Sequence, residues 1–349
     1  MNVQELFLLH YRNFDTLHLK LTSPQIIITG DNGIGKTNIL EAISFLSPGR
    51  GLRYAKLEEL PKVGESNFSI DAVLQTTLGP TKIQTTYSTE TGRRNTEFNG
   101  SKIAHNELAN FINIVWLIPQ MDGLFLGPAS DRRRFLDRVC YSFAPEHAKL
   151  ITQYEHYLKE RIKTLESYPI DDNWLSALEE KLAIAAKDID TNRTVALLAL
   201  QDAIDNMDTS FPKAKLELIP NNKDMGIDEL QSQFRASREQ DTRAGRSHFG
   251  PHRSDLMVYY ANKNMPAKYC STGEQKAMLI SITIAHIIAK RKVGGLSPIL
   301  LLDETFVHLD ETRRGYLAAF LKESDSQVWI TSTEAEMSKY FANAQVIGL

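Results

Sequence analysis

The chain has 349 residues, 42% of them hydrophobic, which is enough for one large or two medium domains with a sizeable core. Its formal net charge of -3 excludes a protein that is basic over its whole surface, so any nucleic-acid binding must come from a local patch. Two distant cysteines, Cys140 and Cys270, provide neither a disulfide framework nor paired metal ligands. No apolar run approaches the roughly 20 residues of a membrane span, and the N-terminus is polar, so the sequence predicts a cytoplasmic protein without a membrane partner.

Strand patterns come first along the chain. Hydrophobic alternation over residues 3–21 predicts strands, and the β-branched run QIIIT at 25–29 is typical of a buried strand that leads into a loop. A helix is expected from about Lys36. Alternation resumes over residues 67–103 as a meander with a tight turn at Asn99–Gly100, and residues 112–120 form a further buried strand.

Helical periodicity replaces this pattern from Asp131. Apolar residues recur at helical spacing in two segments separated by Pro169: Leu150, Tyr154, Leu158 and Leu165, then Leu178, Leu182, Ala185 and Ile189. At ~1.5 Å per residue, a segment of about 20 residues spans only ~30 Å, so we expect a lid and not a long arm. Strand patterns return in PKAKLELIP and DLMVYYA, and the apolar runs PILLLDE and SQVWITSTE are typical of buried parallel strands.

A phosphate-binding loop lies between the strand at 25–29 and the helix after it. The motif G-x-x-x-x-G-K-[ST] matches Gly30 to Thr37, with the strand before and the helix after that it requires. Backbone N–H groups and the helix N-terminus would surround phosphate oxygens, Lys36 would reach the terminal phosphates, and Thr37 would ligate Mg²⁺. The predicted nucleotide-binding residues here are Gly30, Asp31, Asn32, Gly33, Ile34, Gly35, Lys36, Thr37 and Asn38.

Two further stretches carry polar chemistry. After the buried run PILLL, Asp303 is predicted to hold Mg²⁺ and Glu304 to act as the base for an attacking water. Residues 271–275, STGEQ, precede an apolar helix and form a second anion site; because the chain already has its P-loop, Ser271 and Gly273 should face another copy's nucleotide. A well-capped helix is the alternative, and it describes the same residues adequately.

These motifs together resemble a known family. P-loop, STGEQ, LLDE and HLD, in this order, resemble the ABC-type ATPases of the SMC class, and DRRRFLDR, GPHRSDL and LLDETFVHLDETRR are similar to the RecF family of bacterial recombination mediators. The resemblance implies an α/β fold, with an ABC-type P-loop ATPase head and an N-terminal β-rich subdomain. Residues 1–121 and 243–349 would form the discontinuous head, and residues 122–242 an inserted α-helical lid.

The resemblance also implies a function. The protein would bind ATP and Mg²⁺, hydrolyse ATP slowly with stimulation by DNA, dimerise head to tail on ATP, and bind double-stranded and gapped DNA. With RecR and RecO it would help load RecA onto SSB-coated single strands. Gln120 would be a Q-loop glutamine, although the polar end of a buried strand explains it as well, and Asp310 would lie in the D-loop. Thr331 to Thr333 stand where relatives of this class carry a switch histidine, so a hydroxyl of this segment would sense the γ-phosphate.

Local basic residues are the candidates for DNA contacts. Arg50, Arg53 and Lys56 follow the P-loop helix, and Arg132 to Arg134 form the second group. Ordinary solvated cations, or a helix held to the core by Arg–carboxylate pairs, are the alternatives. A transporter ATPase subunit is the alternative function, but in ordinary cassettes the two phosphate motifs lie closer together than Lys36 and Ser271. A small-molecule kinase would need no second anion loop, and an SMC protein would need far longer helices.

Overall fold

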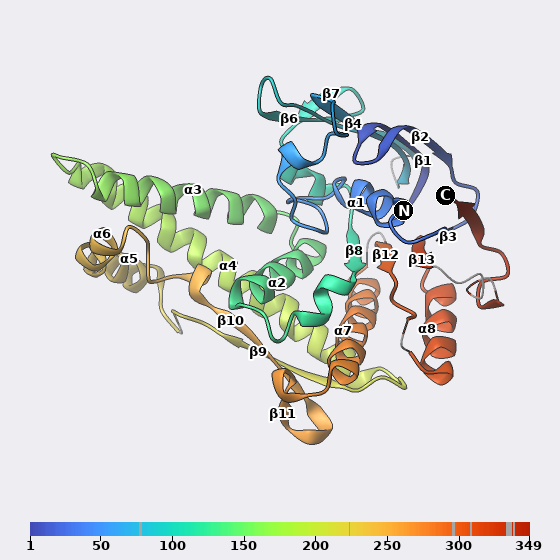
Figure 1. The fold of residues 1–349 in the computed structure, drawn as a ribbon. Helices are drawn as coiled ribbons and strands as arrows, with labels where there is room; N and C mark the ends of the chain where they lie inside the picture. The colour runs from blue at the N-terminus through green and yellow to red at the C-terminus, as the bar shows by residue number, and fades with distance from the viewer. Residues whose placement is uncertain (77–78, 223, 295–296, 308, 333–336, 338) are drawn as a thin grey trace. The chain divides into compact units, whose positions relative to one another are not determined.

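The computed structural model describes the chain except residues 77–78, 223, 295–296, 308, 333–336 and 338 (Figure 1). Its contacts divide it into two compact units. The first contains Met1–Asp122, Met207–Pro212 and Thr272–Leu349, and the second contains Gly123–Asn206 and Lys213–Ser271. These bounds differ from the expected lid of residues 122–242, because the strand at Asp255–Tyr260 pairs with the strand at Ala214–Ile219 and so groups with the helices.

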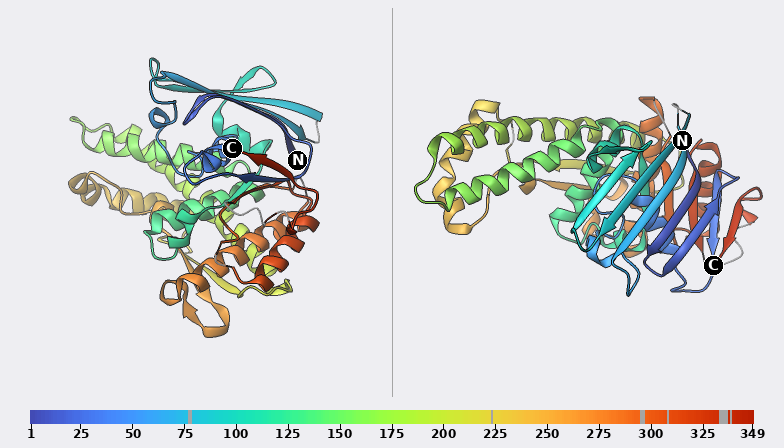
Figure 2. Two further views of the ribbon diagram at one scale, coloured as in Figure 1. Left: turned by 45° about the vertical axis from the view of Figure 1, so that its right-hand side comes forward. Right: turned by 90° about the horizontal axis from the view of Figure 1, so that it is seen from above.

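The first unit begins with an antiparallel sheet in the strand order β2-β1-β4-β5-β6-β7 (Figure 2). One face carries buried apolar residues such as Leu6 and Ile70, while the other carries polar ones, as the alternation in the sequence requires. The predicted strands and the meander are therefore confirmed. The strands are β1 (Asn2–Tyr11), β2 (Phe14–Lys20), β4 (Asn67–Thr76), β5 (Gly79–Ser88), β6 (Arg93–Phe98) and β7 (Ser101–Ile103).

A parallel sheet in the order β14-β3-β13-β12-β8 completes the first unit. Its central strands are continuous buried runs, as predicted, because helices cover them. The strands are β3 (Gln25–Thr29), β8 (Ile114–Leu117), β12 (Ile299–Asp303), β13 (Val328–Ser332) and β14 (Gln345–Gly348). The helices are α1 (Lys36–Ser44), α7 (Thr272–Lys292) and α8 (Glu311–Glu323).

The second unit is mainly helical and includes a small antiparallel sheet in the order β11-β10-β9. Its elements are α2 (Ala129–Phe143), α3 (His147–Leu165), α4 (Asp172–Asn206), α5 (Ile227–Ala236), α6 (Arg238–Ala244), β9 (Ala214–Ile219), β10 (Asp255–Tyr260) and β11 (Met265–Pro266). The expected helical hairpin is α3 and α4. However, α4 has 35 residues and at ~1.5 Å per residue extends ~50 Å, so the expected length of about 20 residues was wrong for this helix.

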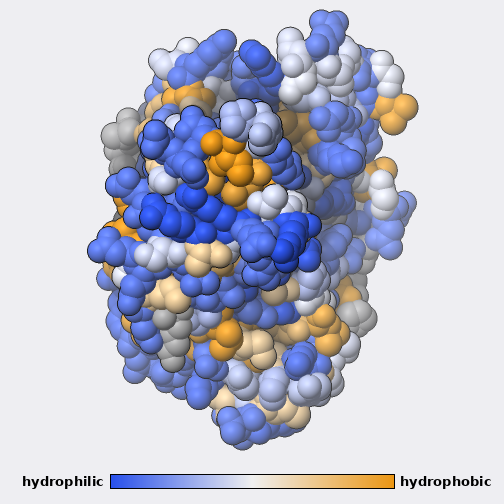
Figure 3. All heavy atoms as spheres, turned by 90° about the vertical axis from the view of Figure 1, so that its left-hand side faces the viewer, coloured by the Kyte–Doolittle hydropathy of each residue, from blue (hydrophilic) through white to orange (hydrophobic). Residues whose placement is uncertain are grey.

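The hairpin has its own apolar core. Tyr154 of α3 packs with Leu230 and Phe234 of α5 and with Phe249. Three of the four residues of the predicted α4 stripe belong to the same core: Leu182, Ala185 and Ile189. Over the described ranges, none of the helices combines the length and apolar character that a membrane crossing needs. The face in Figure 3 is mostly hydrophilic, with apolar residues in small separate groups.

Candidate nucleotide-binding site

The P-loop turns from β3 into α1 through glycines with positive φ. Gly35 has φ 117°, and a Cβ there would lie 2.6 Å from Nδ2 of Asn13, so only glycine fits. Asn13, in the turn between β1 and β2, donates from Nδ2 to the carbonyl of Ile34 (2.8 Å) and accepts at Oδ1 from Asn38 (2.7 Å). The loop is thus held from outside by a neighbouring turn.

Lys36 is buried, and its ammonium group lies inside the loop. Nζ donates to the carbonyls of Gly30 (2.6 Å) and Asp31 (3.0 Å). Because a compact ammonium group can exchange these carbonyls for phosphate oxygens, the lysine is placed for the role that the motif predicts. The N-terminal N–H groups of α1, which have no intrahelical acceptor, begin at the same point.

Asp303 lies at the carboxyl end of β12 and is buried next to the P-loop. Both of its carboxylate oxygens are 3.0 Å from the Thr37 hydroxyl, although 266 residues separate the two positions. Parallel pairing of β12 with β13 places Asp303 opposite Thr331, whose hydroxyl donates to Asp303 Oδ1 (2.6 Å). Strand pairing and the motif therefore bring Lys36, Thr37 and Asp303 into one cluster.

Glu304 follows with a half-exposed side chain. Its φ of 49° is in the left-handed region, and its N–H donates to the Thr331 hydroxyl (3.1 Å). The Thr331 hydroxyl is thus already bonded to Asp303 and Glu304, and its proposed role as a γ-phosphate sensor would require it to leave Asp303. Thr333, the other threonine of that segment, lies outside the described residues.

The donor set fits a nucleotide phosphate with Mg²⁺. Hydroxyl and carboxylate oxygens are the ligands that Mg²⁺ prefers, and the Thr37–Asp303 pair supplies both kinds at the end of the loop. The lysine and the helix N-terminus supply the positive side of the site.

The remaining predicted residues lie elsewhere. Gln120 is exposed in the short 3₁₀ helix Pro119–Gly123 after β8. Asp310, predicted to lie in the D-loop, caps α8 by accepting from the N–H of Arg313 (2.9 Å). Ser271 and Gly273 are exposed; we call residues 271–273, which lead into α7, the signature turn. Their roles remain predictions.

Sequence reasoning missed the support behind the P-loop helix. Glu41 of α1 is fully buried and accepts two hydrogen bonds of 2.8 Å from Arg12. Burial alone lowers the pKa of Arg12, but these bonds to Glu41 outweigh it and the pKa is raised. Arg53, a predicted DNA contact, bonds Asn38 (2.7 Å) and lies 3.5 Å from Glu41. A glutamate on a helix gives no sequence signal for an ion pair with a turn 29 residues away.

The arginines of DRRRFLD are mostly engaged inside the second unit. Arg132 makes a bidentate pair with Asp255 (2.8 Å for each bond), and Arg133 donates to the carbonyl of Ser254 (2.6 Å). Arg134 pairs with Asp131. The alternative of a helix held by Arg–carboxylate pairs therefore describes this segment better than DNA contact. Arg50 and Lys56 are exposed.

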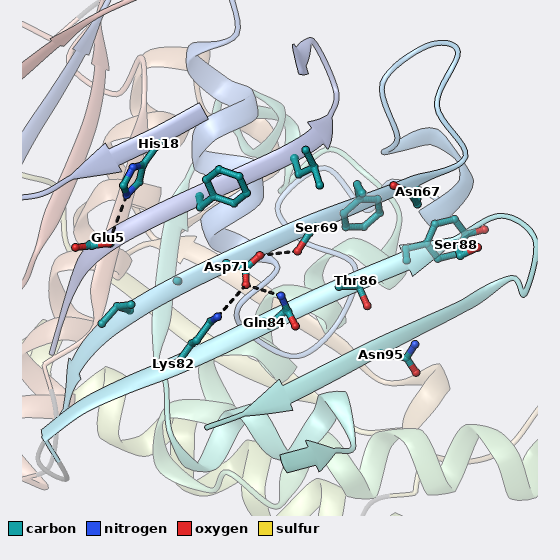
Figure 4. Close-up of a pocket in the computed structure, with 16 residues that line it drawn as sticks. Glu5, His18, Asn67, Ser69, Asp71, Lys82, Gln84, Thr86, Ser88 and Asn95 are labelled. Atoms are coloured by element: carbon teal, nitrogen blue, oxygen red, sulfur yellow. Dashed lines mark hydrogen bonds and ion pairs between the residues drawn. The ribbon is translucent and has the colours of Figure 1, made fainter. Parts of the chain in front are cut away.

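A hollow of about 770 Å³ lies on the polar face of the six-stranded sheet (Figure 4). Asp71 accepts there from Ser69 (2.6 Å) and Gln84 (2.5 Å) and lies 3.6 Å from Lys82, while His18 lies 3.4 Å from Glu5. Charges of both signs pair with one another, and no P-loop residue lines the hollow. We therefore assign it no part in nucleotide binding.

Comparison with known proteins agrees with the motifs. Residues 2–348 match the family model described as the RecF/RecN/SMC N terminal domain. The DNA replication and repair protein RecF of Rickettsia felis is 46% identical over 355 residues, covering 99% of this chain and 98% of that protein. The chain belongs to the RecF family. The RecF protein of Rickettsia bellii is 45% identical over 348 residues, covering 97% of each chain.

Solved RecF structures share the fold. The recombination mediator protein RecF-ATP of the RecFOR pathway matches with a TM-score of 0.83 and 26% identity, covering 95% of this chain and 93% of that chain. RecF-ATPrS matches with a TM-score of 0.84 and 23% identity, covering 100% and 96%. An SMC head bound to the C-terminal winged-helix domain of ScpA shares the fold at a TM-score of 0.57 and 16% identity, covering 100% of this chain and 94% of that chain. The expected α/β, ABC-type ATPase fold is confirmed.

Proposed function

We propose that this RecF-family protein is an ATPase that dimerises on ATP and binds double-stranded DNA at gaps or junctions as a recombination mediator. The observation that carries the proposal is the cluster of Lys36, Thr37 and Asp303, in which a P-loop lysine, a hydroxyl and a buried carboxylate meet. Its place of action would be the cytoplasm. RecR and RecO are the proposed partners in loading RecA onto SSB-coated single strands.

The chemistry divides among a few side chains. Lys36 would exchange the carbonyls of Gly30 and Asp31 for oxygens of the terminal phosphates. Thr37 and Asp303 would hold Mg²⁺, which neutralises phosphate charge when bound. Glu304 would accept the proton of the attacking water, because its side chain is half-exposed whereas Asp303 is engaged by two hydroxyls.

The second half of the site would come from another copy. The signature turn is exposed at the start of α7, a helix of 21 residues, and a helix N-terminus attracts an anion. Ser271 and Gly273 would contact the partner's γ-phosphate. Gln120 and Asp310 remain proposed for the Q-loop and D-loop roles.

Glu304→Gln tests the catalytic part. Loss of the base with conservation of shape should reduce hydrolysis by about 100-fold or more while ATP binding persists, so the ATP-bound dimer should accumulate in sedimentation.

Lys36→Arg replaces the ammonium with a planar fork and should retain some ATP binding and lose hydrolysis. Arg243→Ala, on an exposed helix of the second unit, is the control. Unchanged turnover in Lys36→Arg would contradict the P-loop assignment. A Glu304→Gln protein that stays monomeric with ATP would contradict either the role of Glu304 as the base or dimerisation on ATP.

DNA dependence separates the proposal from its alternative. We expect slow ATP hydrolysis that duplex DNA accelerates, and greater acceleration by gapped DNA. Hydrolysis that is indifferent to DNA would favour a transporter ATPase subunit or another ABC-class enzyme.

A further inference from the structure

A second concentration of cations lies in the helical unit. A cleft of about 500 Å³ separates one face of α3 from the loop that carries the GPHR motif, and its lining includes Leu158, Lys159, Ile162, Lys163, Arg246 and Arg253. Glu166 is the acidic residue in this lining. We call these residues the basic cleft. Four cations facing one carboxylate contrast with the net negative charge of the whole chain.

The four cations form no ion pair with any residue that the structure describes. All are exposed, and within the described part of the chain no salt bridge or side-chain hydrogen bond involves Lys159, Lys163, Arg246 or Arg253. Lys159 and Lys163 are one helical turn apart, a spacing at which like charges destabilise a helix. In contrast, the buried Arg161 between them in sequence bonds Glu179, Asp241 and the carbonyl of Phe234.

The loop opposite α3 is rigidly held. His252 accepts at Nδ1 from the Tyr154 hydroxyl (2.9 Å) and donates from Nε2 to the Ser247 carbonyl (3.1 Å). Burial, with the adjacent Arg253 charge, lowers the pKa of His252 to about 4, so the ring is neutral near pH 7 and fits this donor and acceptor pattern. Gly250 has φ 121°, and a Cβ there would lie 2.2 Å from the Tyr154 hydroxyl. Gly250 and His252 of GPHR therefore hold the loop in place, and Arg253 is exposed to solvent.

The walls of the basic cleft are apolar. Leu158 and Ile162 are half-buried, and lysine stems also cover apolar surface while their charges reach water. A duplex is far wider than a hollow of about 500 Å³, and the backbone of DNA offers no apolar group to fill it. A single side chain fits this volume. We propose that the basic cleft binds an acidic peptide segment of a partner protein, which inserts one bulky apolar side chain between the cations and sets its carboxylates against them.

Fluorescence anisotropy tests this proposal without nucleotide, so its outcome is independent of ATP hydrolysis. The probe is a fluorescein-labelled peptide with one phenylalanine flanked on each side by three acidic residues. Arg253→Glu and Lys163→Glu should each weaken its binding by about tenfold or more, because a like charge would then face the carboxylates. Lys149→Glu, an exposed lysine of α3 outside the cleft, should change binding by less than about twofold. Thermal unfolding midpoints should match the wild type for all three.

Two more probes decide what the basic cleft recognises. A peptide with serine in place of phenylalanine should bind at least about fivefold more weakly, since it leaves the apolar walls uncovered. Arg253→Glu should weaken the binding of labelled duplex and single-stranded DNA by less than about twofold. No binding of the phenylalanine peptide to the wild type, equal binding of the serine peptide, or a loss of DNA binding as large as the loss of peptide binding would each overturn the proposal. The last result would make the cleft a contact for DNA phosphates.

Discussion

The helix α2 and the signature turn are both rich in polar motif residues, but those of α2 pair inside the second unit whereas those of the signature turn are exposed. In α2, Arg132 pairs with Asp255, and Asp137 accepts from the buried Arg193 at 2.8 and 3.0 Å. In the signature turn, Ser271 and Gly273 lie exposed at the start of α7. We infer that the buried motif residues of this family serve the fold, and we propose that the exposed ones serve an outside ligand.

The largest effect on stability should follow from breaking the buried ion pair between Asp137 of α2 and Arg193. Arg193→Ala would leave Asp137 buried without its guanidinium partner and would free the carbonyl of Pro251, to which Arg193 also donates (2.7 Å). We expect the free energy of unfolding to fall by about 3–5 kcal/mol. Urea denaturation measures it, with Arg243→Ala as the control, because that exposed arginine forms a surface pair with Glu239. A loss below about 1 kcal/mol would show that the buried pair is dispensable.

Acid should weaken the same pair. Burial alone would raise the pKa of Asp137, but Arg193 and His147 outweigh it and lower the pKa to about 2. A carboxylate with a depressed pKa stabilises the fold fully above its unfolded pKa of about 4, and this contribution is lost as pH falls toward 2. It amounts to about 2 kcal/mol. Unfolding at pH 6 and pH 3 should differ less in Asp137→Asn than in the wild type, and equal differences would contradict the assignment.

Arg132→Ala should have a smaller effect, because the Arg132–Asp255 pair is partly exposed. Loss of the bidentate pair and of the bond to the Gly127 carbonyl should cost about 1–2 kcal/mol. DNA affinity, measured at constant salt, should be nearly unchanged in the folded variant. A fall in DNA affinity without a fall in stability would indicate that Arg132 contacts DNA. It would contradict the assignment of this arginine to the fold.

Gly273→Ala changes the exposed signature turn and should have the smallest effect on folding. No atom lies within 4 Å of a Cβ built at this position, and alanine favours a helix over glycine by up to about 1 kcal/mol. The thermal midpoint should stay equal or rise slightly, while ATP-dependent dimerisation should weaken if the turn meets a partner's phosphate. A fall in the midpoint would indicate that the turn serves the fold.

Much of the fold follows from patterns within single segments. Alternation and buried runs predict the strands of both sheets in the first unit except β14, and the strand-end position of Asp303 predicts its place beside Thr37. The strand β14 and the helix α8 were not predicted, since β14 has only four residues and α8 buries few of its side chains. Pairs between distant positions were also missed: 123 residues separate Arg132 from Asp255, and no local pattern shows which way an arginine faces.

The central claim is that the P-loop of one copy and the signature turn of another form one site, and mixing two inactive variants tests it most directly. Ser271→Arg should leave its own P-loop intact but block the partner's site, and Lys36→Arg should lose hydrolysis in its own P-loop. In a mixed dimer both defects fall in one site and the other site is intact. Hydrolysis should therefore return on mixing. If mixed dimers form and their hydrolysis only averages that of the two parents, the two motifs do not meet across an interface.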